Sequence, residues 1–599
     1  MKTFWKIVFG SLLGCLIALI IGMFIFIGML GSAASSSMKA SSAAPKVGSV
    51  LRIDKTTLIG ERTTEDISAL AFVSKTSGSR ISLLDAVRAI DAAAADPAIK
   101  LIYMNTDGMA ISLSNAEELR AALARFRASG KAIVTYAENF SPASYYLASV
   151  ADKMVLNTNG EAMLMGVSTQ AIFVKDLLDK LGIEMQLIRH GKYKSAGEMY
   201  IKNAMSEDNR IQTQAMIDGI WNSMADEICA SRSFSREQLD GWISNLELSN
   251  AQTLLDRNMV DTIYYADQMK EYMCNLTETD KFERIGFVNL TDYAPGRLAQ
   301  VAKTKAKDKI AVLYAQGEIV TEGDTEQAIV GAQFAAEVEK VRKDSTIKAV
   351  VFRVNSPGGS VQAAQFVRRE IELLQKEKPV IASYGDYAAS GGYWISAACD
   401  KIFCDNTTLT GSIGVFALIP NFGDAAKKTL KVNVQSVNSH KHGDMMNAMR
   451  SLDASEKDYL QNSIEDVYDE FLTIVSEGRN LTKEAVDEIA QGRVWCGCDA
   501  FGIGLADEKG GLTDAIEYAA IAANLDDYKL VEYPVQKSTM ERLMKMLGGG
   551  ASVKAMFSGI QPATRWDAIA TQFEKAYGFL RNAEKATFYA RMPYITEIK

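Results

Sequence analysis

The sequence predicts an α/β protein in which two tandem copies of one domain follow an N-terminal transmembrane helix. The first observation is an internal repeat: Ile99-Lys100 recurs as Ile347-Lys348, and Asp152-Lys153 recurs at the same offset as Asp400-Lys401. The second is that short apolar runs alternate with segments of helical period in each copy, which is typical of α/β domains. The third is a long uncharged apolar run near the N-terminus, which is typical of a membrane span.

The apolar run extends from Ile7 to Leu30 and contains no charged residue. At about 1.5 Å of rise per residue, a helix of this length crosses the hydrocarbon core of a bilayer, which is about 30 Å thick. Lys2 and Lys6 precede the run, so the positive-inside rule places the short N-terminus in the cytoplasm and the bulk of the chain outside it. A cleaved signal peptide is the alternative, but its apolar region is usually about 7–15 residues long. We therefore predict an uncleaved anchor.

Changes in amino-acid composition mark the boundaries of the other segments of the chain. A stretch of almost only serine and alanine follows the anchor and predicts a flexible stalk. A polar, basic stretch from Ala299 to Lys309 separates the two copies. The predicted segments are a cytoplasmic terminus (1–6), a transmembrane anchor (7–30), a stalk (31–45), a first repeat (46–295), a linker (296–309), a second repeat (310–537) and a C-terminal extension (538–599).

Within each copy the elements follow one another as strand, helix and strand. Leu101–Met104 and Ala349–Phe352 are short apolar runs at equivalent positions, as buried strands require. A segment with apolar residues at helical spacing follows each of them, and then a second strand-like run, Ala132–Val134 or Val380–Ala382. This order is the βαβ pattern, so we predict parallel pairing in each unit. The matching core positions of the two helical segments are Leu119, Leu123 and Phe126 in the first copy and Val367, Ile371 and Leu374 in the second.

Charge and residue counts exclude several classes of function. The formal net charge of −8 is spread along the chain, whereas a nucleic-acid-binding protein requires a concentrated basic face. The 3 histidines and 7 cysteines include no two pairs at zinc-site spacing. We therefore predict no nucleic acid, no metal and no cofactor. Whether Cys399 and Cys404 form a disulfide does not follow from the sequence.

A glycine-containing turn, Asn355-Ser356-Pro357-Gly358-Gly359-Ser360, lies between a predicted strand and a predicted helix. Its glycines let the backbone turn sharply and expose N–H groups that can bind an oxyanion or a phosphate. The turn lacks the Gly-Lys-Ser/Thr ending of a nucleotide P-loop. The first copy has Met109-Ala110-Ile111 at the place of Pro357-Gly358-Gly359. Taken alone, the motif is also consistent with a simple turn.

Ser390 is the candidate nucleophile. Small residues surround it in Ala389-Ser390-Gly391-Gly392, as close approach of a substrate requires, and a helix-like run follows. The helix dipole would stabilise negative charge that develops there. An N-cap serine is the alternative interpretation. The first copy has Pro142 at the equivalent position, so the fold does not require a serine there, and this favours a nucleophile.

A serine nucleophile needs a base, and Lys194 is one candidate. A lysine acts as a base only when neutral, so desolvation or neighbouring cations must lower its pKa. The surrounding Arg189 to Lys194 segment supplies cations, but it also contains Lys192 as a second candidate. His442 stands at the place of Lys194 in the second copy and offers a rival Ser390–His442 pair. No aspartate is marked as the third member of a triad.

Ser412 lies in another turn of small residues, Thr410-Gly411-Ser412-Ile413-Gly414. Its hydroxyl group is a candidate to hold the lysine amine, and a simple turn serine is the alternative. The first copy has Leu164 at this position. The candidate residues are therefore divided between the copies: the second copy holds the serines and glycines, and the first holds Lys194.

These motifs together resemble the signal peptide peptidase A (protease IV) family in its long, tandem-domain bacterial form. The matching segments are Ser356–Gly359, Asp386–Trp394, Thr410–Gly414 and Gly191–Ala196, and the resemblance extends over about residues 1 to 535. It implies two tandem domains with a fold like that of crotonases and Clp-type proteases, and a serine protease that uses a Ser/Lys dyad.

The resemblance also implies a role for each candidate residue. Ser390 would be the nucleophile, Lys194 rather than Lys192 the general base, and Ser412 the residue that orients the lysine amine. The backbone N–H groups of Gly359 and Gly391 would form the oxyanion hole. No cofactor is implied, and neither copy is expected to be active alone.

The implied substrates are cleaved signal peptides and other extended apolar peptides. The implied assembly is a homo-tetramer in the bacterial inner membrane, with its catalytic domains facing the periplasm or the cell exterior. Two alternatives share the fold: a crotonase-like acyl-CoA enzyme, and a catalytically inactive membrane scaffold. The acyl-CoA enzyme would need neither Ser390 nor Lys194, and the scaffold would not need both intact.

Overall fold

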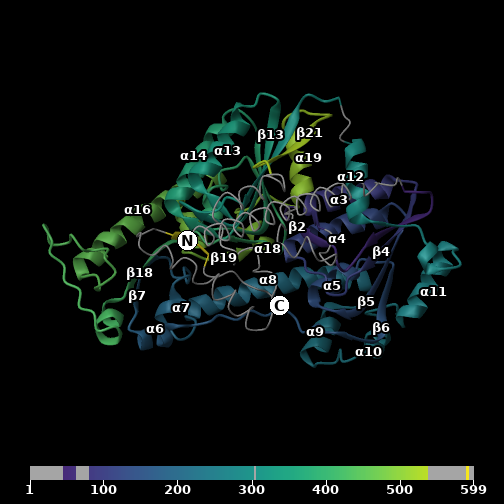
Figure 1. The fold of residues 1–599 in the computed structure, drawn as a ribbon, viewed down its shortest axis with the longest axis horizontal. Helices are drawn as coiled ribbons and strands as arrows, with labels where there is room; N and C mark the ends of the chain where they lie inside the picture. Colours follow the sequence, from purple (N-terminus) through teal and green to yellow (C-terminus); the bar gives the residue numbers. More distant parts are fainter. Residues whose placement is uncertain (1–44, 63–79, 302–304, 537–588, 593–599) are drawn as a thin grey trace, which may run out of the picture.

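The computed structural model describes residues 45–62, 80–301, 305–536 and 589–592 (Figure 1). The predicted cytoplasmic terminus, the anchor and almost all of the stalk lie outside the described residues, as does most of the C-terminal extension. Among the described residues, no helix combines the length and apolar character that a membrane span needs.

The first repeat contains a parallel six-stranded sheet in the order β8-β6-β5-β4-β1-β9. Its predicted strands lie in β4 and β5, which pair in parallel as the βαβ pattern indicates. The bounds are β1 Ser49–Ile53, β4 Ile99–Asn105, β5 Ala132–Phe140, β6 Lys153–Ala162, β8 Thr262–Tyr264 and β9 Phe287–Asn289.

The second repeat contains the corresponding sheet, in the order β19-β17-β15-β13-β10-β21, with β16 paired to β15 and β20 paired to β16. The predicted parallel pair is again confirmed, here as β13 and β15. Only the β17–β19 pair of this sheet is antiparallel among the pairs described. The bounds are β10 Lys309–Gln316, β13 Ile347–Ser356, β15 Val380–Ala389, β16 Lys401–Cys404, β17 Leu409–Gly411, β19 Val494–Cys496, β20 Glu508–Lys509 and β21 Lys529–Tyr533.

Helices cover both sheets. The predicted core positions are buried in α4 (Leu113–Ala128) and α14 (Val361–Gln375), which confirms the matching helices of the two copies. Helix α12 (Leu290–Val301) packs against α3 (Leu83–Ala95), and its Leu298 contacts the core of the first repeat. The first part of the predicted linker is therefore helical. The other covering helices are α13 Gly331–Lys343 and α19 Leu512–Ala522.

Further described elements are two short strands and several helices, of which α16 is the longest. They are β2 Leu58–Gly60, β3 Arg80–Ser82, α5 Pro142–Ala148, α9 Arg236–Ser244, α10 Ala251–Asp256, α11 Ala266–Thr277, α15 Gly391–Trp394, α16 Ala454–Arg479, α17 Lys483–Ile489 and α18 Gly497–Ala500.

A third sheet mixes strands of both repeats, in the order β12-β11-β14-β22-β18-β7. Strand β7 (Glu184–His190) comes from the first repeat and pairs antiparallel with β18 (Val415–Asn421) along its whole length. The other strands are β11 Glu318–Val320, β12 Ala328–Val330, β14 Gly358–Ser360 and β22 Tyr589–Arg591. The segment around β7, with α6 (Lys175–Leu181) and α7 (Glu198–Ile201), therefore extends from the first repeat onto the second (Figure 1).

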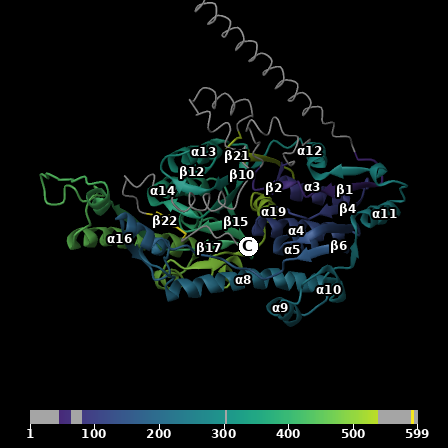
Figure 2. The same ribbon diagram turned by 60° about the horizontal axis from the view of Figure 1, so that its bottom comes forward.

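Helix α8 (Glu207–Arg232) returns the chain to the first repeat. Its 26 residues span about 39 Å at about 1.5 Å per residue. It contacts β19 and α18 of the second repeat along its N-terminal half and α9 of the first repeat. Figure 2 shows α8 running along one side of the molecule, with α9 beside it. Gly219 permits the close contact, because a Cβ there would come within 2.9 Å of the Cys496 Cβ.

A network of buried charges joins the two repeats. The Arg353 side chain on β13 is 1% exposed and pairs with Glu61 at 2.8 Å and with Glu118, on α4, at 2.7 Å. Glu118 also accepts a hydrogen bond from the Leu512 N–H at 2.7 Å. Both carboxylates belong to the first repeat and the arginine to the second, so these charges are paired only when the repeats are in contact.

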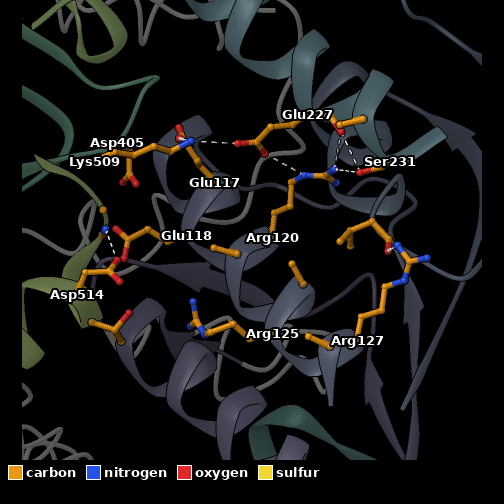
Figure 3. Close-up of a pocket in the computed structure, with 18 residues that line it drawn as sticks. Glu117, Glu118, Arg120, Arg125, Arg127, Glu227, Ser231, Asp405, Lys509 and Asp514 are labelled. Carbon is orange, nitrogen blue, oxygen red and sulfur yellow. Dashed lines mark hydrogen bonds and ion pairs between the residues drawn. The ribbon is translucent and has the colours of Figure 1, made fainter. Parts of the chain in front are cut away.

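A charged cavity of about 790 Å³ lies beside this network (Figure 3). Glu227, on α8, bridges Arg120 and Lys509 at its wall, at distances of 3.1 and 3.3 Å. Neither Ser390 nor Lys194 lines the cavity. It is therefore a space between the repeats that is separate from the candidate catalytic residues.

Replacing Arg353 with leucine is expected to destabilise the protein by about 3–5 kcal/mol, because two buried carboxylates lose their counter-charge. The thermal unfolding midpoint of the detergent-solubilised full-length protein measures the loss. Arg125→Leu is the matched control, since Arg125 pairs with Asp91 at an exposed position, where an ion pair contributes about 0–1 kcal/mol. Equal midpoints for the two variants would contradict a structural role for the buried network.

Candidate active site

Lys194 lies on the loop after β7 and is completely buried. The loop turns at Gly191, whose φ of +101° lies in the left-handed region that glycine tolerates best. The Tyr193 N–H donates a hydrogen bond to the Gln491 carbonyl of the second repeat at 2.9 Å. Gly492 packs so closely that a Cβ there would come within 2.6 Å of the Lys194 Cβ. The first repeat thus places Lys194 in a slot that the second repeat forms.

The Lys194 amine contacts three oxygen atoms of the second repeat. Nζ lies 2.8 Å from Ser390 Oγ, 2.9 Å from the Ser412 carbonyl oxygen and 3.0 Å from Ser412 Oγ. The structure therefore brings the candidate nucleophile, base and orienting serine together. Lys192, the other candidate base, has its amine 5.0 Å from the centre of the Tyr193 ring instead.

Burial lowers the pKa of Lys194 well below its ordinary value of 10.5. The cause is desolvation, which disfavours the ammonium form, and the three facing oxygens are uncharged. The neighbouring basic residues that the sequence suggested as a second cause contact carboxylates: Arg189 pairs with Glu198 at 3.3 Å, and His190 Nδ1 lies 2.6 Å from Glu465 Oε2. A neutral amine has a lone pair that can accept a proton.

Ser390 occupies a strained turn at the end of β15. Its φ of +55° and ψ of −114° are unfavourable for a residue with a Cβ and cost about 1–3 kcal/mol. It precedes α15, but its side chain makes no capping hydrogen bond, so its Oγ is available to Lys194. The equivalent Pro142 has a ring that restricts φ to about −65° and begins α5, where Ser141 is the cap. The two copies therefore differ in backbone conformation at this position.

Gly358 and Gly359 form a cradle beside Ser390, with φ values of +98° and +156°. A Cβ on Gly359 would meet the Ile319 carbonyl oxygen at 2.0 Å, and one on Gly358 would meet the Gly391 nitrogen at 2.6 Å. The Gly359 nitrogen lies 3.1 Å from a Cβ placed on Gly391. The candidate oxyanion donors, Gly359 and Gly391, thus lie on adjacent segments, and this close approach excludes larger residues.

His442 lies between β18 and α16, where its side chain is 41% exposed. Its Nδ1 is 3.0 Å from Glu456 Oε1, and with Asp453 these residues form a group of possible metal ligands within 4.8 Å of one another. Arg450 already pairs with Glu456 at 2.7 Å and neutralises that carboxylate. The structure places His442 in this cluster, whereas the described partner of Ser390 Oγ is Lys194.

Gln212, on α8, is a buried residue that sequence reasoning did not identify. Its Nε2 donates to the Tyr193 carbonyl at 2.9 Å, and its Oε1 accepts from the Val494 N–H at 3.2 Å. It therefore connects the lysine loop to β19 of the second repeat. The ungapped repeat ends near Lys194, so comparison of the copies carries no signal for this position.

One family model and three similar proteins cover most of the chain. The model of peptidase family S49 matches residues 125–280 and 372–526. Protease 4 of Haemophilus influenzae is 32% identical over 516 residues, which cover 82% of this chain and 84% of that protein. Protease 4 of Salmonella typhi is 34% identical over 493 residues (79% and 77%). The chloroplastic serine protease SPPA of Arabidopsis thaliana is 31% identical over 470 residues (77% and 69%).

A Lys194→Met variant tests whether the buried amine is neutral. The native state holds the amine neutral while the unfolded chain protonates it, so wild-type stability rises with pH between the lowered native pKa and 10.5. Methionine does not titrate, so any gain in stability over the wild type is expected to be largest near the low end of this window and to shrink as the pH approaches 10.5. Thermal midpoints across that range measure the difference, with Lys192→Met as the control. A difference that does not vary with pH would contradict a neutral Lys194.

Proposed function

The chain belongs to peptidase family S49, and on that premise we propose that Ser390 and Lys194 are the catalytic dyad of a membrane-anchored endopeptidase for extended apolar peptides. It is a serine protease with two tandem domains of that family. The observation that carries the proposal is the 2.8 Å contact between Ser390 Oγ and a completely buried lysine amine. The apolar run Ile7–Leu30 is the proposed anchor, and remnant signal peptides are the proposed natural substrates.

The first chemical step is the attack of Ser390 on a peptide carbonyl. Neutral Lys194 accepts the proton from Oγ as the new C–O bond forms. The N–H groups of Gly359 and Gly391 stabilise the oxyanion of the tetrahedral intermediate. When Lys194 becomes an ammonium, the carbonyl and hydroxyl oxygens of Ser412 accept its hydrogen bonds and offset part of the cost of the buried charge.

The second half of the reaction uses the same groups in reverse order. Lys194 gives its proton to the leaving amine, and the peptide bond breaks. The neutral lysine then removes a proton from water, which hydrolyses the acyl-serine ester. No cofactor takes part in these steps.

The proposed position of the substrate lies in the third sheet. Strands β14 and β18 lie on either side of β22, and an extended peptide in the place of β22 would gain main-chain hydrogen bonds on both sides. Main-chain pairing accepts many sequences, which suits a protease that degrades peptides of varied composition.

Ser390→Ala and Lys194→Ala are each expected to lower kcat/KM for apolar fluorogenic peptides by about 10³-fold or more, because each removes one member of the dyad. The assay uses the detergent-solubilised full-length protein. Lys192→Ala and His442→Ala are the matched controls and are expected to retain activity within about twofold. Full activity in Lys194→Ala, together with loss in His442→Ala, would overturn the assignment.

Ser412→Ala is expected to lower kcat by about tenfold with little change in KM, because the Lys194 amine loses one of its two oxygen contacts to Ser412 but keeps the carbonyl. Thr408→Val is the matched control, since the buried Thr408 hydroxyl donates to the Gly385 carbonyl at 2.7 Å and contacts neither member of the dyad. A larger effect on KM than on kcat would indicate that Ser412 acts on substrate binding and does not position the base.

A further inference from the structure

Two free thiols lie side by side at the contact between the repeats. Cys496 ends β19, and Cys498 belongs to α18, the next element of the second repeat. Both face helix α8 of the first repeat, which contacts β19 and α18 (Figure 1). A Cβ placed on Gly219 of α8 would lie 3.1 Å from Cys498 Sγ and 3.2 Å from Cys496 Sγ. The two sulfur atoms therefore lie over the same glycine.

The two thiols differ in their access to solvent. Cys496 is 1% exposed, and its thiol donates to the Asn406 carbonyl at 2.9 Å. Cys498 is partly exposed and lines an open cavity of about 670 Å³, together with Ser223 and Arg493. Cavities that bind small molecules have volumes of about 300–1,000 Å³. A small molecule can therefore reach Cys498, whereas Cys496 is covered.

The exposed thiol is also the more readily ionised of the two. Hydrogen bonding between the thiols lowers the pKa of Cys498 below its ordinary value of 9.0 and raises the pKa of Cys496 well above it. The Ser223 hydroxyl group also lowers the pKa of Cys498. By contrast, burial raises the pKa of the Cys404 thiol. Because the thiolate is the reactive form of cysteine, Cys498 is the thiol that attacks first.

The spacing of the pair favours a reversible disulfide over a metal site. Residues two apart in sequence have Cα atoms at most about 7 Å apart, and a disulfide requires about 4.4–6.8 Å. The ring that it would close is small and strained, and a strained disulfide is readily reduced. Among the described residues, the only three side chains spaced to hold a metal ion are those at His442, so the two thiols lack a third ligand.

We propose that Cys496 and Cys498 form a redox site, which a small-molecule disulfide oxidises and whose oxidation lowers the peptidase activity; the effect on activity rests on the proposed function. The proposed location outside the cytoplasm is one in which disulfides form and persist.

The oxidation proceeds by two thiol–disulfide exchanges. The Cys498 thiolate attacks one sulfur of the small disulfide, the bond between its sulfurs breaks, and one thiolate leaves. The mixed disulfide carries no charge on Cys498 Sγ, so the main influence that raised the pKa of Cys496 is gone. Cys496 then attacks Cys498 Sγ, and the second thiolate leaves. The protein loses two electrons and two protons, which convert the small disulfide into two thiols.

Strand β19 connects this pair to the base. Cys496 is the last residue of β19 and lies opposite Leu409 of β17. Just before the strand, the Arg493 carbonyl accepts a hydrogen bond from the Ser412 N–H at 2.7 Å, and Gly492 forms the slot for Lys194. Oxidation removes the thiol donor of Cys496 and draws its sulfur towards residue 498. We therefore expect the end of β19 to shift and the slot to loosen.

Peptide mass spectrometry tests the thiol chemistry. The reduced full-length protein in detergent is incubated with oxidised glutathione, quenched with acid and alkylated with iodoacetamide. Wild type is expected to form the Cys496–Cys498 disulfide. Cys496→Ser is expected to stop at a glutathione adduct on Cys498, and Cys498→Ser is expected to keep a free thiol at Cys496. Cys274→Ser, which changes a partly exposed cysteine elsewhere, is the matched control and is expected to behave as the wild type does.

Hydrolysis of an apolar fluorogenic peptide tests the coupling to the active site. Oxidation is expected to lower kcat of the wild type by at least about fivefold, and dithiothreitol is expected to restore it. Cys498→Ser is expected to keep the activity of the reduced wild type and to lose the response to glutathione. The activity of each reduced variant also reports that it has folded.

The redox site would be overturned by a wild type in which Cys496 and Cys498 remain thiols, by a lasting glutathione adduct on Cys498, or by a disulfide to Cys404 instead. An oxidised wild type with unchanged kcat would overturn the coupling through β19. A wild type that forms the disulfide but hydrolyses no peptide in either state would contradict the proposed function and leave the redox site standing. The two failures are therefore distinguishable.

Discussion

The antiparallel pairing of β7 with β18 is the constraint on which the rest of the site depends. Its ladder runs from Glu184 opposite Asn421 to His190 opposite Val415. Lys194 follows shortly after one end of the ladder, and Ser412 shortly precedes the other strand. A slip of one residue would reverse the face of every side chain on β7 and carry the lysine loop out of its slot. The register between the repeats therefore determines the geometry of the dyad.

Among the described residues, the two most deeply buried basic side chains lie in opposite environments. Arg353 retains its charge because two carboxylates, Glu61 and Glu118, face it at ion-pair distance. Lys194 faces only uncharged oxygens among its described contacts, so burial favours its neutral form. The carboxylates near the lysine loop pair with Arg189 and His190 instead. The lysine without a counter-charge is therefore the proposed base, and the arginine with two carboxylate partners joins the repeats.

The repeated strands and helices were predictable because each copy carries its own apolar pattern. The candidate site residues could be proposed because the copies differ at equivalent positions, as Ser390 and Pro142 do, and the structure brings Ser390, Lys194 and Ser412 into contact. The pairing of β7 with a strand of the other repeat was not predictable, since its residues have the pattern of an ordinary strand of the first copy. Gln212 and Gly492 act through contacts between distant segments that leave no local pattern. The pairing of Tyr589–Arg591 with β14 and β18 was not predictable either, because three residues contain too little alternation to specify a partner strand.

The order of the active-site parts along the chain has a consequence for synthesis. Ribosomes make proteins from the N-terminus, so Lys194 is complete while Ser390, 196 positions later, is still to be made. A growing chain therefore carries a base without a nucleophile, and the slot for that base exists only after Gly492 has been added. Strand β22, which pairs with β14 and β18, is made later still. A nascent molecule is thus inert towards its neighbours until nearly its whole length has folded.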